Sequence, residues 1–218
     1  MHKGLVMKKL AILSFAFFVS QSFGLTLDQV KSALKANIVS RDSVEMNLRV
    51  SVKAPGVYQQ TDIYLINKGP SKSYTEIKSN FLKQRSIVNG NKMKIVDLKT
   101  NKTQVIDYNG DVLASNSYAN FNPLDSGEWT EPKFYSGDVY TIQGSTGTLY
   151  YNEKMKRIEK IEALRNGANT LTKFTYDAYN KIKKMEVSVD VNGTESVVTT
   201  EILRMQKSDN VPDTMFEF

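Results

Sequence analysis

The sequence contains no cysteine and only one histidine, His2, among its 218 residues. His2 lies in an N-terminal segment that has the features of a cleaved signal, so the mature chain would have neither thiol nor imidazole. This excludes serine or cysteine nucleophiles activated by histidine, zinc sites built from these ligands, and disulfide bonds. An enzyme made from this chain would have to use carboxylates, lysine, tyrosine or serine alone.

A hydrophobic run long enough to cross a bilayer is also missing. The longest N-terminal run is Leu10–Val19, far short of the roughly 20 residues that a transmembrane helix needs. It follows a lysine-containing stretch at 1–9 and precedes Ser22 and Gly24, small residues at the −3 and −1 positions of a cleavage site. This pattern is typical of a secretory signal peptide and predicts cleavage before Leu25. Because the chain has no cysteine for a lipid anchor, we expect a soluble exported protein, periplasmic in a host with two membranes.

A strong excess of one charge is absent as well. The whole chain has a formal charge of +6, and removing 1–24 takes away three lysines and no acid, which leaves 26 basic against 23 acidic residues. A surplus this small argues against nucleic acid as the main partner. Length and a 40% hydrophobic content predict one domain, 25–218, after the signal peptide 1–24.

Short runs rich in β-branched and aromatic residues dominate the rest of the chain. Between 58 and 108 they alternate with turn residues at a spacing of about ten, which is typical of an antiparallel meander or barrel. Residues 43–53 alternate strictly and predict a strand with one buried face. Further strands are predicted at 138–143, 148–151, 156–164 and 170–176, followed by a hairpin with strands 185–191 and 195–205 around Asn192-Gly193. The total is about ten strands.

One amphipathic helix is predicted ahead of the sheet, over about 26–38. Thr26 and Gln29 have the spacing of a capping box, and the apolar residues that follow recur at intervals of three and four: Leu27, Val30, Leu34 and Ile38. Such a stripe must cover another apolar surface, and packing on the sheet is the simplest interpretation.

The segment 109–137 breaks the strand pattern and contains Trp129, the only tryptophan. A long irregular segment inside a domain is usually a lid or a binding loop, although Trp129 could also anchor a plain crossover to the core. Three acids in this segment, Asp125, Glu128 and Glu131, cluster in the sequence, and a glycosidase would need such a pair in a cleft. Because they lie in a polar loop, we interpret them as solvated surface. No catalytic, metal or cofactor site is predicted.

These elements predict an α+β fold: a strongly curved antiparallel sheet, open like half of a barrel, with an N-terminal helix and an irregular or helical lid segment over an apolar concavity. Apolar cavities of this kind hold apolar ligands. The predicted cavity residues are Met46, Leu48, Val50, Ile63, Leu65, Met93, Ile95, Trp129 and Phe134. The predicted lid or latch residues are Leu27, Val30, Leu34 and Lys68.

Several motifs in the chain carry a family resemblance. Residues 86–97 (SIVNGNKMKIVD), preceded by 66–70 (INKGP), resemble the central signature of LolA-like lipoprotein carriers, in which a basic residue and a proline close one hairpin and a turn with Asn-Gly opens the next strand. The end of the chain is similar too, with Asn180-Lys181-Ile182, the 192–193 hairpin, and 210–218 (NVPDTMFEF). The resemblance covers about 25–218. Two positions depart from it: Met93 and Lys94 replace the usual aromatic residues, and Lys68 is separated from Pro70 by Gly69.

The resemblance implies a function without catalysis. Such proteins carry acyl chains of lipoproteins through the periplasm toward the outer membrane, working as monomers with transport proteins in the two membranes. A periplasmic module that binds a lipid or a partner as a sensor, without transport, fits the same residues. A carboxylate enzyme is the third class, and the missing histidine and cysteine weigh against it.

Overall fold

The computed structural model describes residues 24–36, 43–69, 71–109, 122–125, 127–145, 147–165 and 167–218. The predicted signal peptide, apart from Gly24, lies outside the described residues. So does most of the first half of the predicted lid segment.

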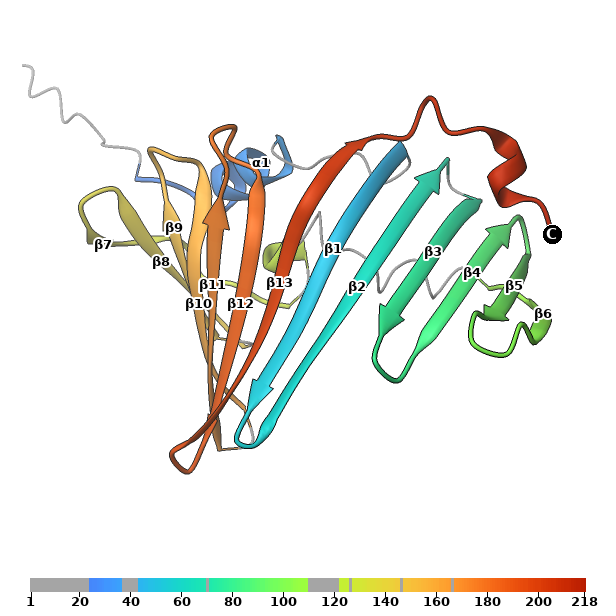
Figure 1. Cartoon of the computed structure of the whole chain (residues 1–218). Helices are drawn as coiled ribbons and strands as arrows, with labels where there is room; N and C mark the ends of the chain where they lie inside the picture. The colour runs from blue at the N-terminus through green and yellow to red at the C-terminus, as the bar shows by residue number, and fades with distance from the viewer. Residues whose placement is uncertain are drawn as a thin grey trace, which may run out of the picture.

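The described residues form one antiparallel sheet with thirteen strands in the order β6-β5-β4-β3-β2-β1-β13-β12-β11-β10-β9-β8-β7 (Figure 1). The sheet is unclosed, because β6 and β7 are its two edges. Its strands are β1 (Ser43–Ala54), β2 (Val57–Lys68), β3 (Lys72–Ser79), β4 (Lys83–Asn89), β5 (Lys92–Asp97), β6 (Thr103–Asp107), β7 (Lys133–Ser136), β8 (Val139–Gly144), β9 (Gly147–Asn152), β10 (Arg157–Arg165), β11 (Ala168–Tyr176), β12 (Ile182–Val191) and β13 (Thr194–Lys207).

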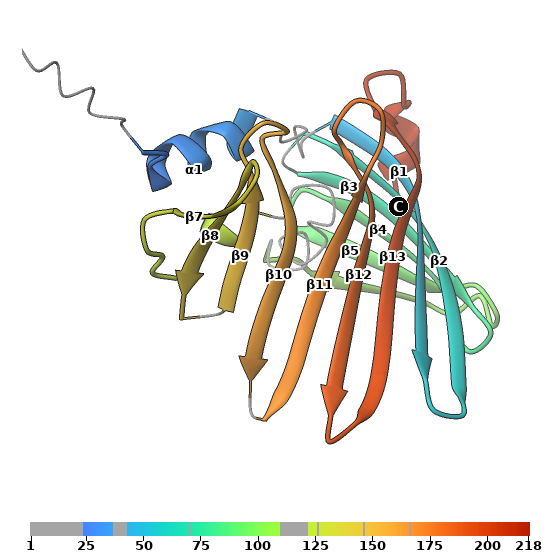
Figure 2. The same cartoon turned by 90° about the vertical axis from the view of Figure 1, so that its left-hand side faces the viewer.

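The sheet is strongly curved, so that β3–β5 lie behind β10–β13 in Figure 2. The joint between the halves is the pairing of β1 with β13. Thus the predicted half-barrel is present, with more strands than the ten expected. The extra strands are short edge pieces: β7, for example, has four residues inside the segment that we predicted to be irregular.

The N-terminal helix α1 (Leu27–Ala36) begins as predicted. The backbone N–H of Thr26 donates to Gln29 Oε1 at 2.9 Å, and the N–H of Gln29 donates to Thr26 Oγ1 at 3.3 Å, so the capping box is formed in both directions. Val30 is fully buried against the sheet. A short 3₁₀ helix, η2 (Pro123–Asp125), reaches the same part of the sheet through the buried Leu124. We call the face that α1 and η2 cover the concave face.

Buried apolar side chains form three clusters. The helix-end cluster lies under α1 and contains Val30, Leu124, Ile142, Leu149, Tyr151, Ile158 and Phe174. The central cluster contains Val44, Met46, Leu48 and Leu65, with Ile63, Ile202 and Met205 packed against it. The outer cluster, on the convex face, contains Ile66, Tyr74, Ile87, Val211 and Phe216.

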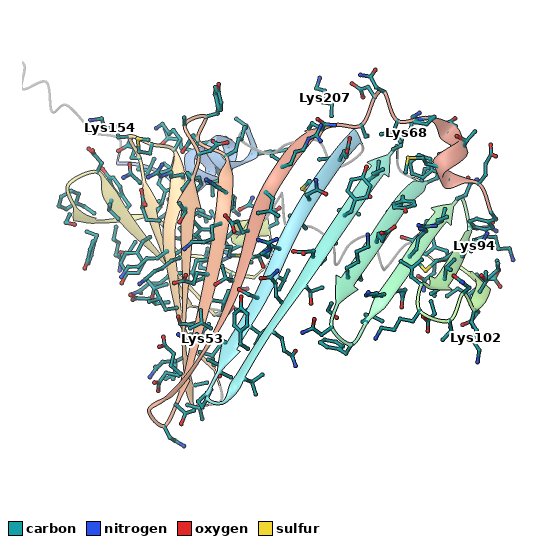
Figure 3. All side chains as sticks on the ribbon, in the orientation of Figure 1. Lys53, Lys68, Lys94, Lys102, Lys154 and Lys207 are labelled. Atoms are coloured by element: carbon teal, nitrogen blue, oxygen red, sulfur yellow. The ribbon has the colours of Figure 1, made fainter. Side chains whose placement is uncertain are left out.

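The outer cluster is where the C-terminal segment crosses the convex face. After β13 the chain turns back over the ends of β2–β4 and finishes in η3 (Asp213–Phe216) (Figure 1). Lys68, labelled beside this segment in Figure 3, donates to the carbonyl oxygen of Val211 at 2.6 Å and pairs with Asp213 at 2.8 Å. Lys72 pairs with the same carboxylate at 2.9 Å. These contacts, together with the buried Phe216, fix the end of the chain.

We predict that acid releases this C-terminal segment. Hydrogen bonds from Lys68 and Lys72 lower the pKa of Asp213 to about 2. A carboxyl whose folded pKa lies below its unfolded value stabilises the fold fully above about pH 4 and loses that contribution as the pH falls through the folded pKa. Amide hydrogen exchange of 211–217 should therefore accelerate as the pH is lowered from about 4 to about 2, relative to the intrinsic rate.

The control is Asp213→Asn, which removes the titrating group. Its C-terminal amides should already exchange faster at neutral pH and should lack the acid-dependent step. An unchanged step in this variant would mean that another carboxyl governs the release.

Candidate functional site

The central cluster of the concave face is built by β1 and its two neighbours. Met46 lies opposite Leu65 on β2 and opposite Met205 on β13. Side chains at every second position of a strand share a face, so Val44, Met46 and Leu48 all point to the same side. All three are buried, and so is Leu65. The alternation that the sequence displays over 43–53 is therefore the observed register of β1.

The apolar surface continues from this cluster in both directions across the sheet. On the β2–β5 side, register places Ile63, Ile77 and Val88 on the same face, followed by the buried Met93 and then Ile95. On the β13–β8 side it passes through Met185 and Phe174 to the helix-end cluster. Val50 lies on the same face of β1 and is half-buried. These apolar side chains share the concave face with polar ones: register places Thr75 and Ser86 between Leu65 and Ile95, and Thr200 between Val50 and Met185. We call this set of apolar side chains the apolar band.

The helix α1 covers one end of this band. Leu27, Ala33 and Leu34 are partly buried against the helix-end cluster, around the fully buried Val30. The N-terminus of the helix is attached to a second segment, because the backbone N–H of Leu27 donates to Glu131 Oε2 at 2.9 Å. Sequence reasoning missed this role of Glu131, which we had interpreted as solvated surface, since a contact between residues so far apart in sequence leaves no local signal.

Trp129 packs against the helix-end cluster from the edge of the sheet. It forms an isolated antiparallel bridge with Gly144, and the N–H of Thr130 donates to the carbonyl oxygen of Gln143 at 2.8 Å. The indole lies directly on Gly144: a methyl group at that glycine would come within 2.5 Å of the ring. Therefore 129–130 and β7, within the predicted lid segment, are parts of the sheet edge.

Two tyrosines bring polar atoms into this apolar end. The Tyr176 hydroxyl donates to the carbonyl oxygen of Ile158 at 2.5 Å, and the guanidinium of Arg157 lies 4.5 Å from the centre of its ring. Burial raises the pKa of Tyr176 well above its usual value. Tyr151 is fully buried, and its hydroxyl has no hydrogen-bond partner. Burial, with a smaller contribution from Glu153, raises its pKa to about 12, so the hydroxyl keeps its proton at neutral pH.

This architecture has relatives among solved structures. No protein-family profile and no curated protein matches the chain. A LolA superfamily protein from Nitrosomonas europaea superposes with a TM-score of 0.57 at 15% identity, over 89% of this chain and 98% of that chain. The chain has the LolA-like fold. A domain from Vibrio parahaemolyticus, described as an outer membrane lipoprotein-sorting protein, reaches a TM-score of 0.49 at 9% identity, over 87% of this chain and 95% of that one.

Within the LolA-like fold, the predicted cavity residues divide into three groups. Met46, Leu48, Val50, Ile63 and Leu65 come together around the central cluster, and Met93 and Ile95 extend it. Trp129 lies apart from them at the helix end. Phe134 is on edge strand β7 and has 67% of its surface exposed, with its ring edge against Tyr140. We leave it out of the proposed site.

The predicted lid residues divide as well. Leu27, Val30 and Leu34 contact the helix-end cluster on the concave face. Lys68 lies on the convex face, where it binds the C-terminal segment. The sequence could not show this, because Lys68 and its partner Asp213 are 145 positions apart. We therefore do not include Lys68 in the proposed lid.

Polar groups on the LolA-like sheet gather on its convex face. One hollow there, of about 450 Å³, is lined mainly by charged and polar side chains, among them Arg49, Asp62, Glu76, Lys78 and Arg204. Burial alone would raise the pKa of Glu76, but hydrogen bonds from its neighbours lower it to about 2; the donors are Lys78, Tyr74 and Arg85. Another hollow, of about 550 Å³, is also rich in polar residues, including Glu162, Asp190 and Glu195.

Other kinds of site find little support in the described part of the chain. Those residues contain no group of three or more potential metal ligands. Across the same ranges, no helix is long and apolar enough to span a membrane.

The close approach of Gly144 to the ring of Trp129 gives a prediction. In Gly144→Ala the new methyl group would occupy the place of the indole ring, with ring atoms at 2.5 and 2.7 Å. The ring must move, and so must the carbonyl oxygen of Glu128, which would lie 2.8 Å from the methyl group, because real Cβ contacts are not this short. We expect a changed emission maximum of the single tryptophan with a modest loss of stability, measured by fluorescence and by urea unfolding. Gly127→Ala is the control for a nearby glycine that has no contact below 3.5 Å; an identical spectrum in both variants would contradict the observed stacking.

Proposed function

We propose that the protein is a periplasmic carrier that binds the acyl chains of lipoproteins or lipids along its concave face and passes them toward the outer membrane. The observation that carries the proposal is the set of apolar side chains on that face, gathered in the central cluster and the helix-end cluster and extended by Met93 and Ile95. A surface of this composition suits hydrocarbon chains, since burial of each methylene contributes about 0.8 kcal/mol. The LolA-like fold supports the same ligand class by analogy.

In this proposal α1 is a lid that competes with the ligand. Its contact with the sheet rests on one fully buried side chain, Val30, and on the partly buried Leu27, Ala33 and Leu34. One long acyl chain gains on the order of 10 kcal/mol gross before ordering costs, and a carrier that kept all of it would not release its cargo. Apolar contacts that α1 makes in the empty protein reduce the net gain, because the ligand has to replace them.

The experiment that separates a carrier from a simple binding module is a transfer assay. Donor vesicles contain a fluorescent triacylated lipopeptide, acceptor vesicles contain none, and the purified mature protein is added in catalytic amount. A carrier accelerates the transfer in proportion to its concentration. A sensor without transport would bind the lipopeptide stoichiometrically and leave the transfer rate at its spontaneous value. If no lipopeptide binds at all, the proposed function is wrong.

A further inference from the structure

The polar atom that stands out in the apolar end of the concave face is the hydroxyl of Tyr151. Other half-buried or buried tyrosines have a partner: Tyr64 donates to Glu45, Tyr74 to Glu76, Tyr150 to Glu162 and Tyr176 to the carbonyl of Ile158. Tyr151 has none, although its side chain is completely buried. An unpaired hydroxyl inside a protein lowers stability, and phenylalanine would fill the same place without that loss.

The position of Tyr151 connects this hydroxyl with the proposed binding face. Tyr151 is on β9, opposite Tyr140 on β8 and Ile158 on β10, and it belongs to the cluster that α1 and η2 cover. The lid that separates this cluster from solvent includes Val30. When α1 moves away, the apolar end of the band opens, and Tyr151 becomes the polar group within it.

We infer that the Tyr151 hydroxyl binds the ester or amide carbonyl of an acylated ligand once α1 has been displaced. This rests on the proposed function and assigns its ligand class: acyl esters and amides in preference to plain hydrocarbons or ethers. The acyl tail lies along the apolar band, and the carbonyl oxygen accepts the hydrogen bond that the empty protein lacks.

The charges around Tyr151 favour a neutral acceptor. Burial holds the pKa of this phenol at about 12, so it acts as a donor at neutral pH. The charged neighbour that acts on it is the carboxylate of Glu153, which also interacts with Tyr140. A free fatty acid would bring a second carboxylate toward Glu153, whereas an ester or amide carbonyl carries no charge. The site therefore suits an acyl chain that is already esterified or amide-linked.

Two lipids that differ only at the carbonyl test this inference. 1-Palmitoylglycerol carries an ester, and 1-O-hexadecylglycerol is its ether analogue. We expect wild-type protein to bind the ester about tenfold more tightly, the ratio that one well-formed hydrogen bond supports. Tyr151→Phe should reduce this ratio to about one, leave the affinity for the ether unchanged, and keep or raise the thermal midpoint of the empty protein.

The control is Tyr176→Phe, which removes a hydroxyl that already has a protein partner. It should lower the thermal midpoint and leave the ester-to-ether ratio as in the wild type. A ratio near one in the wild-type protein, or a ratio that survives Tyr151→Phe, overturns the inference while the proposed function stands. If the wild type binds neither of these lipids nor a triacylated lipopeptide, the proposed function itself is contradicted.

Discussion

Leu48→Asp is expected to lower the free energy of unfolding by about 4 kcal/mol or more at neutral pH. Leu48 has only 1% of its surface exposed and lies in the central cluster beside Met46 and Leu65. Removing a buried leucine side chain costs about 2–5 kcal/mol, and the new carboxylate would lose its hydration without gaining a partner. Since natural domains are stable by about 5–15 kcal/mol, the change should appear as a large fall in the urea midpoint.

The same variant has a predictable pH dependence. The buried carboxyl would have a folded pKa above its unfolded value, because burial disfavours the charged form. The protonated form therefore fits the fold better, and the destabilisation should grow as the pH rises from about 4 to about 8.

The matched control is Leu203→Asp on the neighbouring strand β13. Leu203 has 48% of its surface exposed, so a charge there remains hydrated and should change stability by no more than about 0.5 kcal/mol. Equal stability of Leu48→Asp and Leu203→Asp would mean that the register of β1 is displaced by one residue.

Gly147→Ala is expected to lower the free energy of unfolding by about 2–6 kcal/mol. Gly147 begins β9 with φ of +138°, a conformation that side chains rarely adopt, and a Cβ there would lie 2.3 Å from the carbonyl oxygen of Glu162. Backbone strain contributes about 1–3 kcal/mol and overpacking a similar amount. The neighbour that must move is backbone of β10, so the β9–β10 pairing has to shift.

Gly167→Ala separates the two contributions. Gly167 also has a positive φ, +77°, but a Cβ there meets nothing within 4 Å. This variant should show only the conformational cost of about 1–2 kcal/mol. If urea unfolding gives the same loss for both variants, the close approach of β10 to Gly147 is absent in solution.

Strict alternation was the most informative pattern in the sequence. It correctly predicted the buried face of β1 and, with the capping box, the start of α1. The Asn192-Gly193 hairpin was also predicted correctly: both residues have positive φ, 52° and 81°, which a two-residue turn of this kind requires.

Irregularities in the register limited the rest of the prediction. Extra residues in the pairing, Glu159 on β10 and Leu203 on β13 where it pairs with β1, change which residues of those two strands share a face. For this reason Leu149, Tyr151 and Ile158 could not be identified as a cluster from parity. The edge strand β7 was missed because four residues carry too little pattern.

Contacts between segments that are distant in sequence could not be predicted either. The attachment of α1 to Glu131 and of the C-terminal segment to Lys68 joins residues more than a hundred positions apart. Such pairs leave no periodic signal, since Glu131 and Lys68 look like ordinary exposed charges in the sequence and their partners are backbone groups. For this reason the sequence did not show that the predicted latch residue Lys68 lies on the convex face and binds the C-terminal segment.

The measurement that tests the central claim most directly is the emission of Trp129 during a titration with triacylated lipopeptide. Trp129 is the only indole in the chain and packs against the cluster that α1 covers, so its signal reports on that end of the binding face. With refolded, delipidated protein, the account predicts a saturable emission shift at a stoichiometry of one, and an affinity that rises with acyl length by up to about fourfold per methylene. The account would be contradicted if the emission of Trp129 stayed constant through the titration and a hydrophobic probe also showed no binding.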